Sequence, residues 1–187
     1  MPVRDTMSAN INKTRLLIHD NSTTHQFTDQ EIQDTLDTNR RDIRYLMLTP
    51  EPTYAGNVVQ YLDYYSSLSN WEDDATFWQN RITQVTPSTS EPLAGHWTFS
   101  ESVVPGVYIN GKTYDLYNSA ADLLEYWIAK VAFEYDVVVG GQTFKRSQAQ
   151  EMLRTLALNY RSHELFSPQG TKSVKMVRSD VRSGSWR

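Results

Sequence analysis

The 187-residue chain contains no cysteine, which excludes a disulfide framework and any thiolate site. It also has no run approaching the ~18 apolar residues that a membrane-spanning helix needs. Its first twenty residues lack the apolar segment of a signal peptide. From these absences we expect a soluble, unexported protein, compatible with a reducing compartment. The length fits one domain with an elaborated insertion.

Motifs of catalytic and metal-binding chemistry are missing as well. The four histidines are scattered and form no HExxH pattern, and there is no Gly-x-Ser-x-Gly elbow. The acidic run Trp71-Glu72-Asp73-Asp74 lacks the spacing of a calcium loop, so we interpret it as a solvated turn between strands. Gly140-Gly141 precedes a helix without a phosphate-loop pattern and is interpreted as a tight turn. We therefore predict no enzymatic activity, no cofactor and no metal.

Two helical patterns on either side of that turn predict an antiparallel helical hairpin over residues 115–162. Asp115 is the expected N-cap of the first helix, and Ser147 with Gln150 forms a capping box for the second. The second helix is expected to carry Ala149, Met152, Ala157 and Tyr160 on its apolar face. The residues predicted to form the hairpin core are Leu116, Leu123, Leu124, Trp127, Val131, Leu153 and Leu156.

A further helix is predicted over residues 28–40 by a capping box and a hydrophobic staple. Thr28 and Glu31 have the spacing of the capping box, and Phe27 with Ile32 has that of the staple. The preceding residues 1–26 are polar apart from residues 16–18, which could form a short strand or an extended arm. We predict that they make an N-terminal arm.

Between residues 43 and 115 the apolar residues no longer follow the spacing of a helix. This segment has many β-branched and aromatic residues, separated by turn formers. We predict an antiparallel β insertion, with strands near 43–48, 57–65, 76–85 and 95–100 and a hairpin over 106–115. Asn110-Gly111, a preferred two-residue turn, predicts that last hairpin. The many rings of this segment could be core residues with scattered surface tyrosines, or one face of the sheet could be an interface.

The C-terminal residues 164–187 have five basic residues against two acidic ones, a net charge of +3, whereas the whole chain carries −4. Their Pro, Gly and Ser content predicts disorder in the isolated chain. Either this segment is a simple flexible terminus, or its late apolar residues bind a partner. The predicted fold is thus α+β. Residues 27–163 form one domain, a small helical bundle with an antiparallel β insertion over residues 43–115, and an extended basic tail follows.

The sequence resembles the head-tail adaptor, or connector, proteins of long-tailed double-stranded-DNA bacteriophages. The resemblance covers most of residues 27–162 and rests on four stretches. They are the helix FTDQEIQDTLDTNRRDIRY, the WEDD turn before a strand ending in Thr86-Pro87, the strand GHWTF, and YDLYNSAADLLEYWIAKVA with the later GGQTFKRSQAQEMLRTLALNYR.

This resemblance implies a structural virion protein that forms a ring, typically of twelve subunits, between the portal and the tail. Its implied partners are other copies of the chain, the portal protein, a stopper or tail protein, and DNA that passes without sequence specificity. It would reside in the virion neck, and in the host cytoplasm before assembly. A tail-completion or baseplate subunit with an aromatic β face remains the alternative.

Two sets of residues are candidates for these contacts. The second helix and its turn are locally basic and would meet DNA phosphate if they border the lumen. The alternative is an ordinary solvated helix face, since surface charge is the default. The possible lumen residues are Lys145, Arg146, Arg154 and Arg161. The residues expected to dock the tail on the portal are Lys172, Val174, Lys175, Met176, Val177, Arg178, Arg182 and Trp186.

Overall fold

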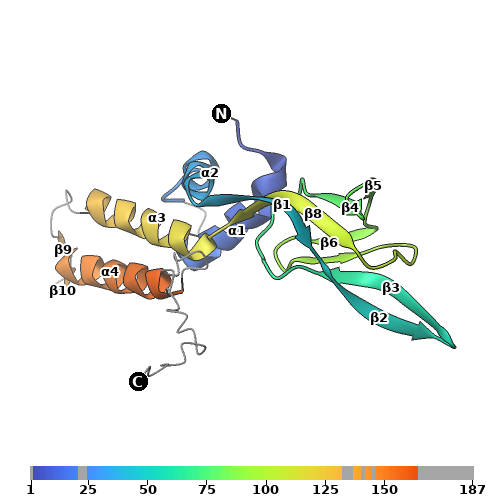
Figure 1. Cartoon of the computed structure of the whole chain (residues 1–187). Helices are drawn as coiled ribbons and strands as arrows, with labels where there is room; N and C mark the ends of the chain where they lie inside the picture. Colours follow the sequence, from blue (N-terminus) through green and yellow to red (C-terminus); the bar gives the residue numbers. More distant parts are fainter. Residues whose placement is uncertain (1, 21–24, 132–136, 140–141, 145, 164–187) are drawn as a thin grey trace, which may run out of the picture.

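The computed structural model describes residues 2–20, 25–131, 137–139, 142–144 and 146–163. Within these ranges the chain forms four α-helices, two four-stranded antiparallel sheets and one two-stranded sheet. The predicted α+β fold, with its helical hairpin, is confirmed. The helical hairpin lies at one end of the molecule and the sheets at the other, with the first two helices packed on the hairpin (Figure 1). The predicted tail, residues 164–187, lies outside the described ranges.

The N-terminal segment differs from the strand or extended arm that we expected. It forms a short 3-10 helix (Asp5–Met7) followed by helix α1 (Ser8–Leu17). Met7, Ile11 and Ile18 are buried in the helical core, so this segment belongs to the body of the molecule. The spacing of apolar residues does not predict this helix, because its buried face includes the polar Asn10 and its exposed face includes Leu16.

Helix α2 (Asp29–Thr38) begins as the sequence predicts. The amide of Glu31 donates to Thr28 Oγ1 over 3.2 Å, and the amide of Thr28 donates to Glu31 Oε2 over 2.7 Å. Phe27 and Ile32 are both buried, as expected for the staple. Local interactions therefore define the start of the helix, and the ion pair of Asp29 with Arg15 at 2.6 Å adds a tertiary contact there.

The β insertion forms two sheets that share a core. The first sheet has the order β1 (Arg40–Met47), β8 (Val107–Tyr114), β4 (Thr76–Gln79), β5 (Thr83–Val85). The second has the order β2 (Thr49–Ala55), β3 (Val58–Tyr65), β7 (His96–Thr98), β6 (Thr89–Glu91). Five rings lie between the sheets, several of them in edge-to-face contact: Tyr64, Trp71, Phe77, Trp97 and Phe99. Most of the aromatic content of the insertion is therefore core.

The hairpin predicted at Asn110-Gly111 is wrong, because residues 107–114 form a single strand, β8. This strand pairs with β1 on one side and with β4 on the other. Gly111 has a packing role instead, since a Cβ there would lie 3.2 Å from Ala75 Cβ and 3.3 Å from Trp71 Cε3. Pairing on both sides of β8 therefore overrides the local turn signal.

Helix α3 (Leu116–Val131) and helix α4 (Arg146–Ser162) pack side by side as the predicted hairpin (Figure 1). Asp115 caps α3, since its Oδ1 accepts from the amide of Asn118 over 3.0 Å. The strands β9 (Val137–Val139) and β10 (Gln142–Phe144), which the sequence did not predict, pair between the two helices. Gly140, Gly141 and the side chain of Ser147 lie outside the described part of the chain. Helix α4 begins at Arg146, so Ser147 lies inside the helix and not at the N-cap position that the sequence predicted.

The described residues of the predicted hairpin core lie in the helical core or against it. Leu116, Leu123 and Leu124 are buried, whereas Trp127, Leu153 and Leu156 are partly buried and pack against the core. The side chain of Val131 lies outside the described set. Met152 and Ala149 were expected on the inner face but are exposed, with Met152 at 74%. The inner face of α4 is therefore narrower than the sequence predicts.

Candidate functional site

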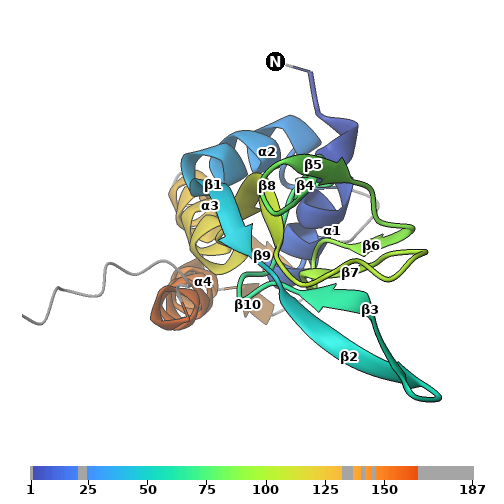
Figure 2. The ribbon, with the colours of Figure 1, turned by 45° about the vertical axis from the view of Figure 1, so that its right-hand side comes forward.

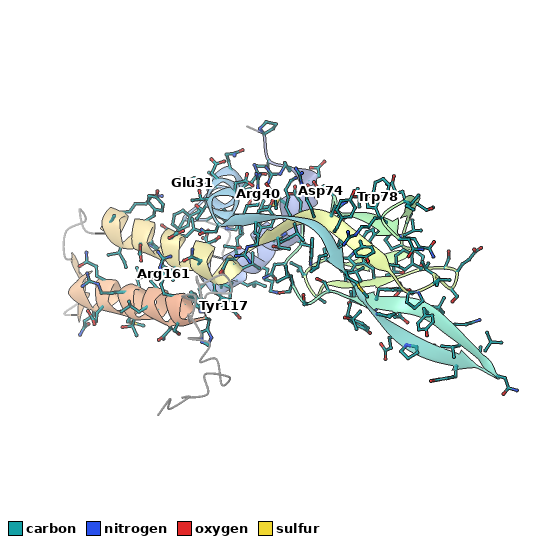
Figure 3. The ribbon with its side chains drawn as sticks, viewed as in Figure 1. Glu31, Arg40, Asp74, Trp78, Tyr117 and Arg161 are labelled. Carbon is teal, nitrogen blue, oxygen red and sulfur yellow. The ribbon has the colours of Figure 1, made fainter. Side chains whose placement is uncertain are left out.

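Helix α4 of the hairpin carries basic residues, and two of them, Arg154 and Arg161, have different surroundings. Arg161 pairs with Asp122 at 2.6 Å and with Glu125 at 3.3 Å, and it also donates to Asn118 (Figure 3). Burial by itself would lower the pKa of Arg161, but the two carboxylates outweigh burial and raise it. Arg161 therefore uses its charge to join α4 to α3.

Arg154 lies two helical turns before Arg161, and its side chain is exposed. It lines a shallow groove of about 210 Å³ together with Glu125, Ile128, Ala157 and Leu158. The side chains of Lys145 and Arg146 lie outside the described set. Of the four possible lumen residues, the structure thus presents Arg154 to solvent and commits Arg161 to contacts within the chain.

An acidic groove of about 610 Å³ lies on the other side of α3, where α2 packs against it. Asp34, Asp122 and Glu125 supply its carboxylates, and Tyr126 is 63% exposed at its rim. Arg161 offsets part of this charge through its two ion pairs. This face of the hairpin is therefore polar and mildly acidic.

A second groove, of about 540 Å³, is mainly apolar and is called the α4 groove below. Its walls come from the end of α1, the second half of α3 and one face of α4. Its apolar residues are Ile18, Trp127, Met152, Leu153 and Leu156. Trp127 is also in edge-to-face contact with Phe27, at 6.3 Å between ring centroids, so the groove lies directly over the helical core.

The hairpin of β2 and β3, called the arm below, extends away from the rest of the molecule (Figure 2). Residues 51–59 are all exposed. They include Tyr54, Val58 and Val59, which are 72%, 61% and 41% exposed. Exposed apolar residues grouped in this way mark interaction sites more often than isolated ones do.

The outer face of the first sheet carries a stack of rings and a guanidinium. Arg81 lies over the ring of Tyr108 at 4.7 Å and over that of Tyr45 at 5.6 Å. Met47 pairs with Tyr108 across the strands and is 56% exposed. Tyrosine, arginine and methionine are enriched at protein interfaces, so this face is a further candidate contact surface.

The acidic run is only in part the solvated turn that the sequence indicated. Asp73 and Asp74 are exposed in a turn, whereas Glu72 is completely buried. Its carboxylate accepts from Tyr114 Oη at 2.5 Å, Thr6 Oγ1 at 2.7 Å, Arg4 Nε at 2.9 Å and Lys112 Nζ at 3.2 Å. Arg4 also pairs with Asp37 of α2 at 2.7 Å. This network joins the N-terminus, α2 and the first sheet.

The pKa values of the network follow from these contacts. Burial by itself would raise the pKa of Glu72. The hydrogen bonds to it, that of Tyr114 foremost, and the charge of Arg4 outweigh burial and hold its pKa at about 2. Burial and the neighbouring Glu72 carboxylate raise the pKa of Tyr114. Glu72 is therefore ionised in the folded protein at neutral pH, and its role here is structural.

The part of the chain that the structure describes holds no group of three or more histidine or acidic side chains placed to bind a metal ion. Among the same residues, none of the helices combines the length and the apolar content needed to cross a bilayer. Comparison of the chain with protein-family models, curated proteins and solved structures finds no match. The function is therefore argued from the surfaces described above.

The sequence left open that one face of the sheet is an interface, but it did not identify the arm or the Tyr108 face as that surface. Tyrosine and valine occur in these surfaces and also in the buried strands, so residue type alone did not separate exposed from buried strands. An uncharged stretch over residues 53–62 was the available signal for the arm. The predicted portal-docking residues, from Lys172 to Trp186, lie outside the described residues.

Proposed function

We propose that this chain is a head-tail adaptor of a long-tailed double-stranded-DNA bacteriophage. In this role it is a structural protein of the virion neck that forms a ring between the portal and the tail, through which DNA passes. The observation that carries the proposal is the presence of exposed apolar surfaces at opposite ends of one elongated subunit, the arm and the α4 groove (Figure 1).

Such a distribution suits a ring because each subunit of a ring uses two different faces. A head-to-tail contact repeats around a closed circle when its rotation closes, whereas a two-fold dimer uses one self-complementary patch. The arm and the α4 groove are different surfaces with different shapes. A helical hairpin also packs readily beside a copy of itself, and Tyr126 and Leu158 are exposed on its flanks at 63% and 65%.

The proposed conduit function requires weak contact with DNA, because the duplex must slide. Arg154 is exposed and is the described member of the lumen set best placed to meet phosphate. A contact of this kind is electrostatic and carries no sequence information. The mildly acidic groove beside Asp34 and Glu125 would oppose tight binding if it also bordered the channel.

Co-purification with the portal protein of the same phage tests the proposal. The full chain is expected to elute with the portal and to form a ring on it in electron micrographs. A variant with Lys172, Lys175, Arg178 and Arg182 all changed to Glu should lose the portal while its thermal unfolding is unchanged. Unimpaired co-purification of this variant would contradict portal docking by the tail, and failure of the unmodified chain to bind would contradict the function.

A tail-completion or baseplate subunit is the second candidate, and the stack of Arg81 on Tyr108 and Tyr45 favours it. That face would then contact another tail protein. The two functions differ in symmetry, since an adaptor ring is expected to be twelvefold and a tail ring sixfold. They also differ in the effect of Tyr108→Ala, which should abolish particle binding only for the second candidate.

A further inference from the structure

The arm makes few contacts with the rest of the described fold. β2 is the outer strand of its sheet, and β3 pairs with β7 only at Asp63, Tyr64 and Tyr65. Backbone contacts from residues 99 and 103 reach residues 61 and 62, and Ser102 accepts from the amide of Tyr61. Beyond that point the arm is a two-stranded hairpin, which is marginally stable in water by itself.

Charge patterning distinguishes the arm from an ordinary surface hairpin. Residues 53–62 contain no charged side chain, although exposed strands are normally protected by charges. Pro50 and Pro52 lie in β2 near the body and remove backbone donors from its free edge. Strand addition is thereby disfavoured near the body, and the exposed side chains of Tyr54 and Val58 remain as the binding elements. An uncharged, β-prone and exposed segment is an aggregation hazard unless an assembly covers it.

The α4 groove has the complementary character. Among the described residues that line it, Glu151 is the one acidic side chain, and most of the others are apolar or uncharged. It lies at the helical end of the molecule, opposite the arm (Figure 1). Met152 is 74% exposed on its rim, and methionine adapts readily to the shape of an incoming side chain.

We infer that the arm of one copy inserts into the α4 groove of a neighbouring copy, with Tyr54 and Val58 against Trp127 and Met152. The occupant of the groove is thus a second copy of this chain. The inference deepens the proposed ring by naming its subunit contact, and it rests on that proposal for the closure of the ring.

The apolar character of both surfaces selects this groove over the other surfaces described for the same chain. The groove at Asp34 and Glu125 would leave carboxylates facing an uncharged hairpin, which costs free energy because buried charges need partners. The face at Tyr108 already has the Arg81 guanidinium over it. An uncharged tip and an apolar groove, by contrast, lose few hydrogen bonds to water when they meet.

Cross-linking of single-cysteine variants tests the inference directly, since the natural chain has no cysteine. Purified full-length Tyr54→Cys is mixed with Met152→Cys over a concentration series and treated with a short bismaleimide. The control partner is Leu158→Cys, which is also exposed on α4 but lines the other groove, with Glu125 and Arg154. Any arm-to-α4 product in these mixtures joins two different chains.

The expected result is a Tyr54–Met152 hetero-dimer in clear excess over the Tyr54–Leu158 product at every concentration. Adding Val58→Glu to the arm should lower the yield by roughly tenfold or more, because the new carboxylate would be placed in an apolar groove whose acidic residue, Glu151, carries a charge of the same sign. Val58 is 61% exposed, so this variant is expected to fold normally, which its circular dichroism checks. Equal yields with the two partners, or no hetero-dimer at the highest concentration, would overturn the inference.

Two further outcomes separate the alternatives. A cross-link from Met152→Cys to Val177→Cys within one chain, in place of the arm product, would assign the groove to the C-terminal segment and overturn the inference. Arm cross-linking without a ring on the portal would support the contact and contradict the adaptor function. A portal-bound ring whose assembly tolerates Val58→Glu would support the adaptor function and contradict the contact.

Discussion

Tyr114 Oη lies 2.5 Å from Glu72 Oε2, and this hydrogen bond connects the two hydrophobic cores of the protein. Tyr114 is buried in the helical core, whereas the residue before Glu72, Trp71, is buried between the sheets. Arg4 extends the connection to Asp37 of α2. A buried carboxylate with several donors thus holds the helical part and the β part in one arrangement.

Replacing the carboxylate of Glu72 by an amide should destabilise the whole fold. Glu72→Gln leaves Arg4 and Lys112 without their shared anion, and we expect a loss of about 2–4 kcal/mol in the free energy of unfolding. Asp74→Asn is the matched control, because Asp74 also pairs with Lys112, at 2.8 Å, but is exposed. It should cost less than about 0.5 kcal/mol in urea titration. Equal effects of the two variants would contradict the central role of Glu72.

The same carboxylate predicts how stability depends on pH. The pKa of Glu72 is about 2 in the folded protein against an ordinary value of 4.5, so its ionised form favours folding. This contribution is complete above about pH 4.5 and is lost as the pH falls toward 2, amounting to at most about 3 kcal/mol. The gap in unfolding free energy between the natural chain and Glu72→Gln should therefore narrow over that range. A gap that stays constant down to pH 2.5 would argue against the low pKa.

Local patterns predicted the elements whose determinants lie close together in the sequence. The start of α2 depends on Thr28 and Glu31, and the cap of α3 depends on Asp115, so both could be predicted. Helix α1 was missed because Asn10 faces inward and Leu16 faces outward. The contacts of Glu72 could not be predicted from local patterns, because its partners Thr6 and Tyr114 are 66 and 42 residues away along the chain.

Gly111 was assigned to a turn because its contacts also come from residues distant in the sequence. Its packing role can be tested. Gly111→Ala should cost about 1–3 kcal/mol, because the new methyl group presses on Ala75 and Trp71 in a filled core. Ala75→Gly removes one of these contacts and should recover part of the loss in the double variant. Thermal unfolding of the four proteins gives the coupling energy. Additive effects would mean that the two sites do not meet.

The basic residues of α4 are expected to differ in what they do. Arg161→Ala removes the pairs with Asp122 and Glu125 and should cost about 1 kcal/mol of stability, with little effect on DNA. Arg154→Ala should leave stability unchanged and, if α4 borders the channel, reduce the salt dependence of DNA binding by about one phosphate contact. Chemical denaturation and DNA binding at several salt concentrations measure the two effects. If Arg161→Ala instead lowered the salt dependence of DNA binding and Arg154→Ala did not, Arg161 rather than Arg154 would contact the DNA.

The most direct measurement of the proposed function is the rotational symmetry of this chain in the isolated neck. Cryo-electron microscopy of the full chain bound to its portal should show a twelvefold ring with an open lumen, placed between the portal and the tail. In that ring each arm should reach the α4 groove of the next subunit. A sixfold ring on the tail side, or density for this chain away from the DNA channel, would contradict the adaptor assignment.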